Sequence, residues 1–169
     1  MIAYVVRPLR RAIHALFAHD TPHQLALGFA LGMMLGLMPK GNLIALSMCV
    51  LLFSLRVNAG LGFAAVVLFS WAGPLVDPFA DKLGLAVLSA DSLQGSYAAV
   101  FQLPLGPWLG FQNTVVTGSL LVGLYLAYPV YWTMFVACRS LQPQIASRTN
   151  QAGSVRPHGD GESFPRRAA

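Results

Sequence analysis

The stretch VNAGLGFAAVVLFSWAGPLV, residues 57–76, contains no Asp, Glu, Lys or Arg. A helix needs about 20 predominantly apolar residues to cross the roughly 30 Å hydrocarbon core of a bilayer. A second stretch of this kind, TVVTGSLLVGLYLAYPVYWTMFVAC, covers residues 114–138. The two stretches therefore predict two long transmembrane helices.

The composition of the whole chain agrees with a lipid environment. Of its 169 residues, 56% are hydrophobic and 10% are charged, whereas an ordinary soluble domain has about 45–50% and about 25%. A soluble protein of this size needs a polar shell, which six acidic and eleven basic residues cannot supply. We therefore expect an all-α integral membrane protein, with residues 21–141 as its helical membrane domain.

Two shorter apolar segments precede the first long one. Residues 24–38 and 43–55 comprise 15 and 13 residues, and at about 1.5 Å per residue they extend only about 20–23 Å. We expect residues 24–55 to form a re-entrant or short helical hairpin that turns at Pro39-Lys40-Gly41-Asn42. Two short spans remain the alternative.

A third apolar segment, residues 93–113, lies between the two long stretches. Pro104, Gly106 and Pro107 interrupt it, and proline inside a helix removes a backbone hydrogen bond. We therefore expect a broken apolar element that is re-entrant or interfacial.

The sparse charges predict the orientation. Three arginines lie near the N-terminus and five in the C-terminal region, whereas residues 77–91 carry three acids and one lysine. Because basic segments stay in the cytoplasm, both termini are expected inside and residues 77–91 are expected to be an outer connector. Pro78, between Asp77 and Asp81, argues against a regular helix there.

The two ends of the chain have compositions of their own. In residues 1–20, apolar side chains and arginines fall on opposite arcs at about 100° per residue, which predicts an amphipathic helix in the cytoplasmic interface. A solvated helix that packs on a partner is the alternative. Residues 142–169 are rich in polar residues, Gly and Pro, and are expected to be a disordered cytoplasmic tail.

Six motifs occur in order along the chain: Thr21-Pro22, Leu25-Ala26-Leu27-Gly28, Pro39-Lys40-Gly41-Asn42, Arg56-Val57-Asn58, Pro74-Leu75-Val76-Asp77-Pro78 and Asn113-Thr114-Val115-Val116-Thr117-Gly118-Ser119. In these motifs the chain resembles a bacterial membrane family known only as a domain of unknown function, and in particular its short stand-alone members. Many members carry two asparagines before Thr-Val-Val, where this chain has Gln112-Asn113. The resemblance implies a location in the bacterial cytoplasmic (inner) membrane and supplies no mechanism.

The two long stretches share the same spacing of Asn and Pro, which indicates an internal repeat. Asn58 lies sixteen residues before Pro74, and Asn113 lies sixteen before Pro129. Each pair brackets one long stretch, and each stretch follows a shorter apolar element. Because the first unit would start inside and the second outside, the pattern predicts an inverted-topology repeat of the kind found in transporters.

Three glycines, Gly28, Gly32 and Gly36, recur every four residues in the first short segment. Such glycines let another backbone approach closely, which is how membrane helices gain packing contacts. We expect this face to pack against the chain's own long helices, with homodimerisation as the alternative.

Lys40 is the charge that points most directly to a function. With Gly41 and Asn42 it precedes the second short helix, whose first backbone N–H groups could hold an anion. Arg56 and Asn58, at the next turn, would assist. The alternatives are a Lys40 that extends to the headgroups and an Arg56 that anchors its helix at the interface.

Other functions lack their signals. Glu162 is the only glutamate, and no nucleophile, zinc or phosphate-loop motif is present, so we expect no enzymatic activity. His19, Asp20 and His23 are separated by Pro22, and we expect no metal or cofactor. The net charge of +5 is too dispersed to predict binding to nucleic acid.

Two hypotheses remain. The first is a transporter-like or lipid-handling protein that acts through the cationic hairpin tip. The second is a non-catalytic membrane subunit or scaffold that stabilises a partner. Membrane lipids and a homo-oligomer or membrane-protein partner are the expected contacts. Facing hairpins would favour the first hypothesis, and a solid apolar bundle without a polar cavity would weigh against it.

Overall fold

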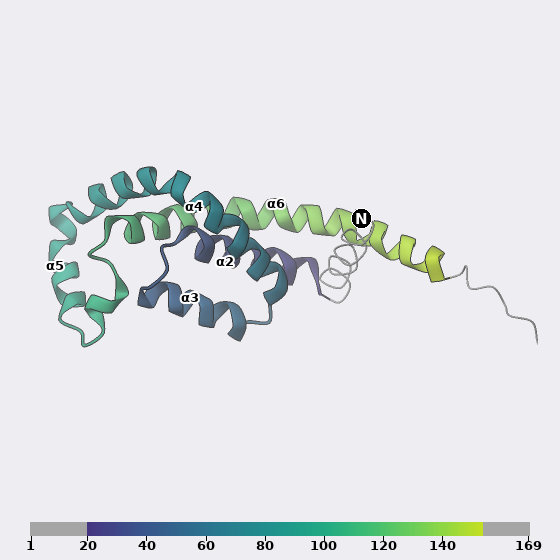
Figure 1. Ribbon diagram of the computed structural model, residues 1–169, viewed down its shortest axis with the longest axis horizontal. Coiled ribbons are helices and arrows are strands. Elements are labelled where there is room, and N and C mark those ends of the chain that lie inside the picture. The colour runs from purple at the N-terminus through teal and green to yellow at the C-terminus, as the bar shows by residue number, and fades with distance from the viewer. Residues whose placement is uncertain (1–19, 154–169) are drawn as a thin grey trace, which may run out of the picture.

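The computed structural model describes residues 20–153, with side chains as far as residue 141. This part of the chain contains five α-helices and a short 3₁₀ helix, and no strand (Figure 1). The elements are α2 (Pro22–Leu37), α3 (Leu43–Ser54), α4 (Ala59–Leu88), α5 (Asp91–Phe101), η1 (Gly106–Leu109) and α6 (Thr114–Gly153). The predicted all-α class is confirmed for these residues. The helix expected in residues 1–20 lies outside them, apart from Asp20.

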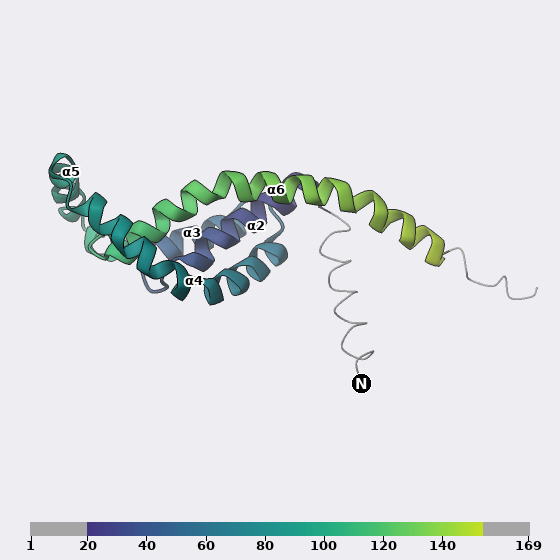
Figure 2. The ribbon, with the colours of Figure 1, turned by 90° about the horizontal axis from the view of Figure 1, so that it is seen from above.

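Helix α2 forms the centre of the bundle. It begins with a capping box, in which the Thr21 hydroxyl accepts from the Gln24 backbone N–H and the Gln24 side chain accepts from the Thr21 N–H. Figure 2 shows α2 between α4 and α6. Leu25, Ala26 and Met33 are completely buried there.

Helix α4 is longer than the sequence predicts, because it continues through Pro74 and Pro78 to Leu88. The expectation of a connector that is not a regular helix is therefore wrong for residues 77–88. Both prolines are exposed, so their rings lie on the outer surface and only the local backbone hydrogen bonds are lost. Asp77 and Asp81 are one helical turn apart on α4.

Helix α6 also exceeds its predicted length. It covers the expected span 114–138 and continues to Gly153, so the prediction of disorder is wrong for the backbone of residues 142–153. Extending an existing helix by one residue costs far less than nucleating a new one, and composition alone does not register this difference. Residues 154–169 lie outside the described part of the chain.

Residues 93–113 are broken as predicted. Helix α5 ends at Phe101, the chain turns through Pro104, and η1 follows. No residue of α5 is buried, and Figure 1 shows α5 at the end of the molecule, beyond the hairpin.

The two long helices run antiparallel. At one end Leu61 of α4 and Cys138 of α6 belong to one buried cluster. At the other end Gly118 of α6 lies against the Ala80 carbonyl of α4. Helices α4 and α6 are both long and apolar enough to cross a membrane.

Candidate functional site: the hairpin tip

The glycine row of α2 faces α4. A Cβ added at Gly28 would lie 2.5 Å from the Asn58 carbonyl oxygen, and one added at Gly32 would lie 2.1 Å from the Gly62 carbonyl oxygen. A Cβ at Gly36 would lie 2.7 Å from the Phe69 Cβ. The three glycines therefore pack within the chain, as the sequence predicts.

This close packing places the hairpin turn beside the middle of α4. The carbonyl oxygens of Gly36 and Leu37 lie about 4 Å from where a Gly73 Cβ would be. Gly73 is the fifteenth of the thirty residues of α4. The chain therefore turns from α2 to α3 at half the length of the helix that it packs against.

Lys40 lies at this turn, and its ammonium group has two partners. Nζ donates to the Gly36 carbonyl oxygen at 2.8 Å and to the Ser70 Oγ at 2.9 Å. Ser70 in turn donates to the Val66 carbonyl oxygen at 2.6 Å. Asp77 lies two turns beyond Ser70 on the same face of α4.

Gly41 and Asn42 shape the turn. Gly41 has a φ of 101°, a left-handed conformation that side chains disfavour. The Asn42 side chain accepts from the Ala45 N–H at 2.8 Å and donates to the Pro39 carbonyl oxygen at 2.7 Å. Asn42 therefore caps α3, so its side-chain oxygen occupies a backbone donor of the predicted anion site.

Arg56 and Asn58 do not join Lys40. They follow α3, whose twelve residues separate them from the turn by about 18 Å. Asn58 is buried and caps α4, accepting from the Leu61 N–H at 2.6 Å and donating to Asp20 at 2.6 Å. The expectation that Arg56 and Asn58 assist Lys40 is therefore wrong, because α3 lies between the two turns and keeps these residues too far from Lys40.

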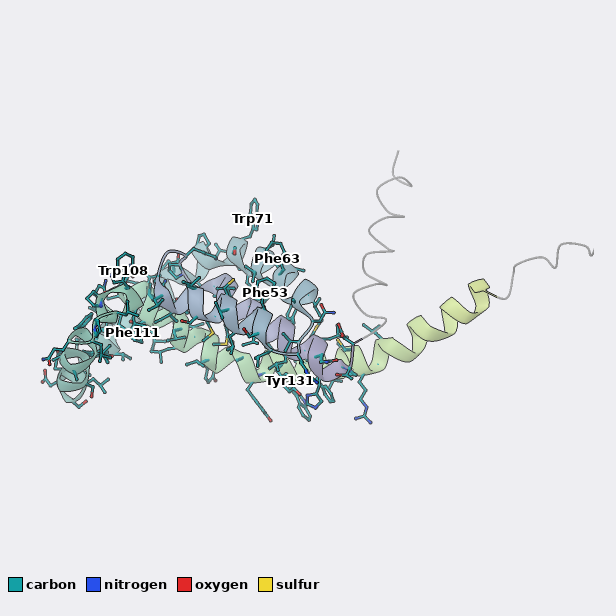
Figure 3. The ribbon with its side chains drawn as sticks, turned by 90° about the horizontal axis from the view of Figure 1, so that it is seen from below. Phe53, Phe63, Trp71, Trp108, Phe111 and Tyr131 are labelled. Carbon is teal, nitrogen blue, oxygen red and sulfur yellow. The ribbon has the colours of Figure 1, made fainter. Side chains whose placement is uncertain are left out.

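The segment around η1 reaches the hairpin tip from the opposite end of the bundle. A Cβ added at Gly110, whose φ is 84°, would lie 2.9 Å from the Asn42 Cβ. Leu109 and Phe111 pack against a buried cluster that contains Met38 and Ile44. In Figure 3 Trp108 and Phe111 lie near this end of the hairpin. The hairpin of residues 24–55 and the broken element of residues 93–113 therefore meet at the turn.

A groove of about 480 Å³ opens beside this contact. Its walls come from the end of α2, the turn, the first half of α3, α4 and η1. They are lined by Leu35, Lys40, Gly41, Asn42, Leu43, Ala45, Leu46, Cys49, Val66 and Trp108. Lys40 is the only charged residue among them, so the groove is apolar with a single cation at one edge.

The repeat landmarks have matching local roles. Asn58 caps α4, and the Asn113 side chain accepts from the Val115 N–H at 2.9 Å at the start of α6. Pro74 and Pro129 each lie inside the helix that follows. The short elements differ, because α2 is largely buried and α5 has no buried residue. The inverted repeat stays a prediction.

Some parts of the site are not recognisable from sequence. Ser70 and Trp108 lie in apolar stretches, where serine and tryptophan are common and carry no spacing signal. Gly110 follows a proline-rich turn, and a glycine there predicts a turn without predicting what it touches. Only the packing of α2 on α4 brings these residues to Lys40.

His23, one of the residues considered above as metal ligands, makes aromatic contacts. His23 Nδ1 lies 2.5 Å from the Tyr131 hydroxyl, and its ring centroid lies 4.9 Å from that of Phe135. In the described part of the chain no group of three His, Cys, Asp or Glu residues could hold a metal ion.

Among the described residues, the fold is that of an all-α protein with two helices that are long and apolar enough to cross a membrane and with the short helix α2 packed between them. The chain belongs to the bacterial family described as "Uncharacterized protein conserved in bacteria (DUF2062)", which matches residues 6–144. An "Uncharacterized protein" of Treponema pallidum (strain Nichols) is 32% identical over 127 residues, which cover 75% of this chain and 78% of that protein. No solved structure matches.

Proposed function

We propose that this protein is a multi-pass protein of the bacterial inner membrane, with both termini in the cytoplasm, and that it binds membrane lipid at the hairpin tip. The exposed apolar surface supports the membrane location. Only 22% and 11% of the most apolar windows of α4 and α6 are buried, which is too little for the core helices of a soluble protein. Trp71, Leu75 and Tyr125 are each more than 80% exposed, and Figure 3 shows Trp71 projecting outward.

The packing of the long helices supports a bilayer position. From Leu61 to Ala80, helix α4 rises about 29 Å at 1.5 Å per residue, which matches the roughly 30 Å of bilayer hydrocarbon. On this scale Ser70, the partner of Lys40, lies about 14 Å from the Leu61 end. A re-entrant hairpin therefore accounts better for residues 24–55 than two short spans do, because its turn lies near the midplane.

One observation carries the lipid-binding proposal: the Lys40 ammonium lies at the edge of the apolar groove, near the middle of α4. A charged residue at that depth is costly in a membrane and marks a functional site by default. The apolar walls suit an acyl chain and offer a polar solute few partners. The hairpin turn lies against η1, which favours a transporter-like arrangement. The apolar lining of the groove favours lipid over a polar solute.

The test is lipid retention. The protein is extracted in a mild detergent, and the lipids that stay bound are identified by native mass spectrometry. We expect wild-type protein to retain lipid and Lys40→Met to retain less. The matched control is Lys82→Met, which removes an exposed lysine of α4 distant from the turn. Equal retention by all three proteins would refute lipid binding at the tip.

A membrane subunit or scaffold is the second candidate, favoured by the outer face of α3. Val50 and Phe53 are each more than half exposed there. A photo-crosslinking amino acid at position 53 would distinguish the candidates in intact cells. Adducts with one membrane protein support the subunit, adducts with a second copy support a homo-oligomer, and lipid adducts alone support the lipid-binding role. We propose a non-enzymatic role in either case.

A further inference from the structure

We propose that the groove at the hairpin tip selects anionic single-chain or double-chain lipids, with the phosphate or carboxylate head on Lys40 and an acyl chain along α3 toward Cys49. This inference rests on the proposed lipid binding and adds the class of lipid. Three features of the described residues carry it: the partners of the ammonium, the charge balance around it, and the course of the groove.

The Lys40 ammonium retains donor capacity toward the groove. Of its three N–H groups, Gly36 and Ser70 accept two. Both acceptors are uncharged oxygens, so they hold the ammonium in place without neutralising it. A phosphate or carboxylate oxygen on the third N–H would form a charge-assisted hydrogen bond, which is roughly twice as strong as a neutral one.

The charge around Lys40 is incompletely balanced. Among the described residues, Lys40 donates to Gly36 and Ser70, and no hydrogen bond joins its side chain to Asp77. The rest of the groove lining is uncharged. Because a cation in a low-dielectric region is expensive without a close counter-charge, an anionic head is favoured over a neutral or cationic one.

The groove runs from the charged edge along apolar residues. Leu46 and Cys49 of α3 lie one turn apart on the same side of that helix, and Val66 of α4 also lines the groove. Trp108 lines it as well, from η1. The volume of about 480 Å³ falls within the range of small-molecule sites and is sufficient for an acyl segment.

Trp108 makes the test direct, because its fluorescence reports on a brominated chain inside the groove. In a Trp71→Phe, Trp132→Phe background Trp108 is the only tryptophan. The protein is reconstituted in bilayers of neutral lipid and titrated with 10-bromodecyl phosphate or with 10-bromodecanol. We expect saturable quenching by the phosphate at concentrations at least tenfold below those that the alcohol needs. We also expect unbrominated decyl phosphate to reverse it.

Variants assign the effect to Lys40 and to the groove. Lys40→Met is expected to weaken decyl phosphate binding at least tenfold, Lys40→Arg to preserve it within a few-fold, and Lys82→Met to leave it unchanged. Cys49→Phe narrows the groove, retains Lys40 and adds no tryptophan, so we expect it to weaken decyl phosphate binding in a protein whose hairpin turn is intact. Circular dichroism and elution as a single species establish that each variant is folded.

The outcomes separate the two proposals. If the alcohol and the phosphate quench at equal concentrations, the groove binds lipid without charge selection, and the inference fails while the proposed function stands. If neither quenches saturably, both fail. If inorganic phosphate alone displaces bromodecyl phosphate at the same concentration as decyl phosphate does, the site is a free-phosphate site and the acyl part of the inference is wrong.

Discussion

At the scale of one residue, Gly32 has no space for a side chain, and this predicts that a larger residue there destabilises the protein. A Cβ there would lie 2.1 Å from the Gly62 carbonyl oxygen and 2.9 Å from the Ala65 Cβ. Gly32→Ala should therefore force α2 and α4 apart and destabilise the protein by about 1–3 kcal/mol. The measurement is the midpoint of thermal unfolding in detergent.

Gly95→Ala is the matched control for that change. Gly95 lies in α5 with nothing within 4 Å of an added Cβ, so alanine should stabilise the helix by up to about 1 kcal/mol. Gly→Ala is thus expected to lower the stability of the protein at position 32 and to raise it at position 95. A Gly32→Ala protein as stable as wild type would contradict the close approach of α2 and α4.

The two capping asparagines should differ in their contribution to stability. Asn58 is 6% exposed and donates to Asp20 in addition to its cap, whereas Asn113 is exposed and accepts from the backbone N–H groups of Val115 and Val116. Asn113→Ala should cost about 1 kcal/mol. Asn58→Ala should cost about 2–3 kcal/mol, because it also removes the part-buried hydrogen bond to Asp20. Chemical denaturation in mixed micelles would compare the two, and equal losses would count against the buried network.

At the scale of elements, the depth of the hairpin is testable by thiol accessibility. In a background with Cys49→Ala and Cys138→Ala, single cysteines at positions 40 and 81 are treated in intact cells with a membrane-impermeant maleimide. A re-entrant hairpin predicts that Asp81→Cys reacts at least tenfold faster than Lys40→Cys, because a turn near the bilayer midplane is shielded by hydrocarbon from the aqueous reagent. Equal rates would instead favour two short spans with an outer turn.

Local rules predict the beginnings of the elements better than their ends. The predicted apolar segments begin at residues 24, 43, 57 and 114, and the corresponding helices begin at Pro22, Leu43, Ala59 and Thr114. The ends of α4 and α6 are predicted poorly. Helix α4 tolerates exposed prolines because packing against α2 and α6 compensates for the hydrogen bonds lost, and that packing is not visible in a local window.

At the scale of the whole molecule, the proposed topology predicts the sides on which reporters function. Green fluorescent protein fused after residue 169 should fluoresce, and alkaline phosphatase at the same point should be inactive. Alkaline phosphatase fused after Ser89, at the end of α4, should be active because α4 ends outside. An active phosphatase at the C-terminus would overturn the cytoplasmic assignment of that end.

Only those parts of the candidate site that depend on local sequence are predictable. Lys40 stands out because a lone charge between apolar segments is visible in the sequence. The sequence also predicts that Arg56 assists Lys40, since both residues lie at turns next to α3. In the structure Lys40 donates to Ser70, thirty positions away, and lines a groove together with Trp108, sixty-eight positions away. The length of α3 separates Lys40 from Arg56.

The sequence by itself determined the all-α class, the two long apolar helices, the glycine row and the cationic turn. Each of these depends on composition or spacing within one segment, where hydrophobic length and helix periodicity act locally. Only the tertiary structure decided how far along α4 the turn lies, that η1 meets it, and that an apolar groove opens at Lys40. These features depend on how closely backbones approach across α2 and α4, and that distance is set by contacts between residues far apart in the chain.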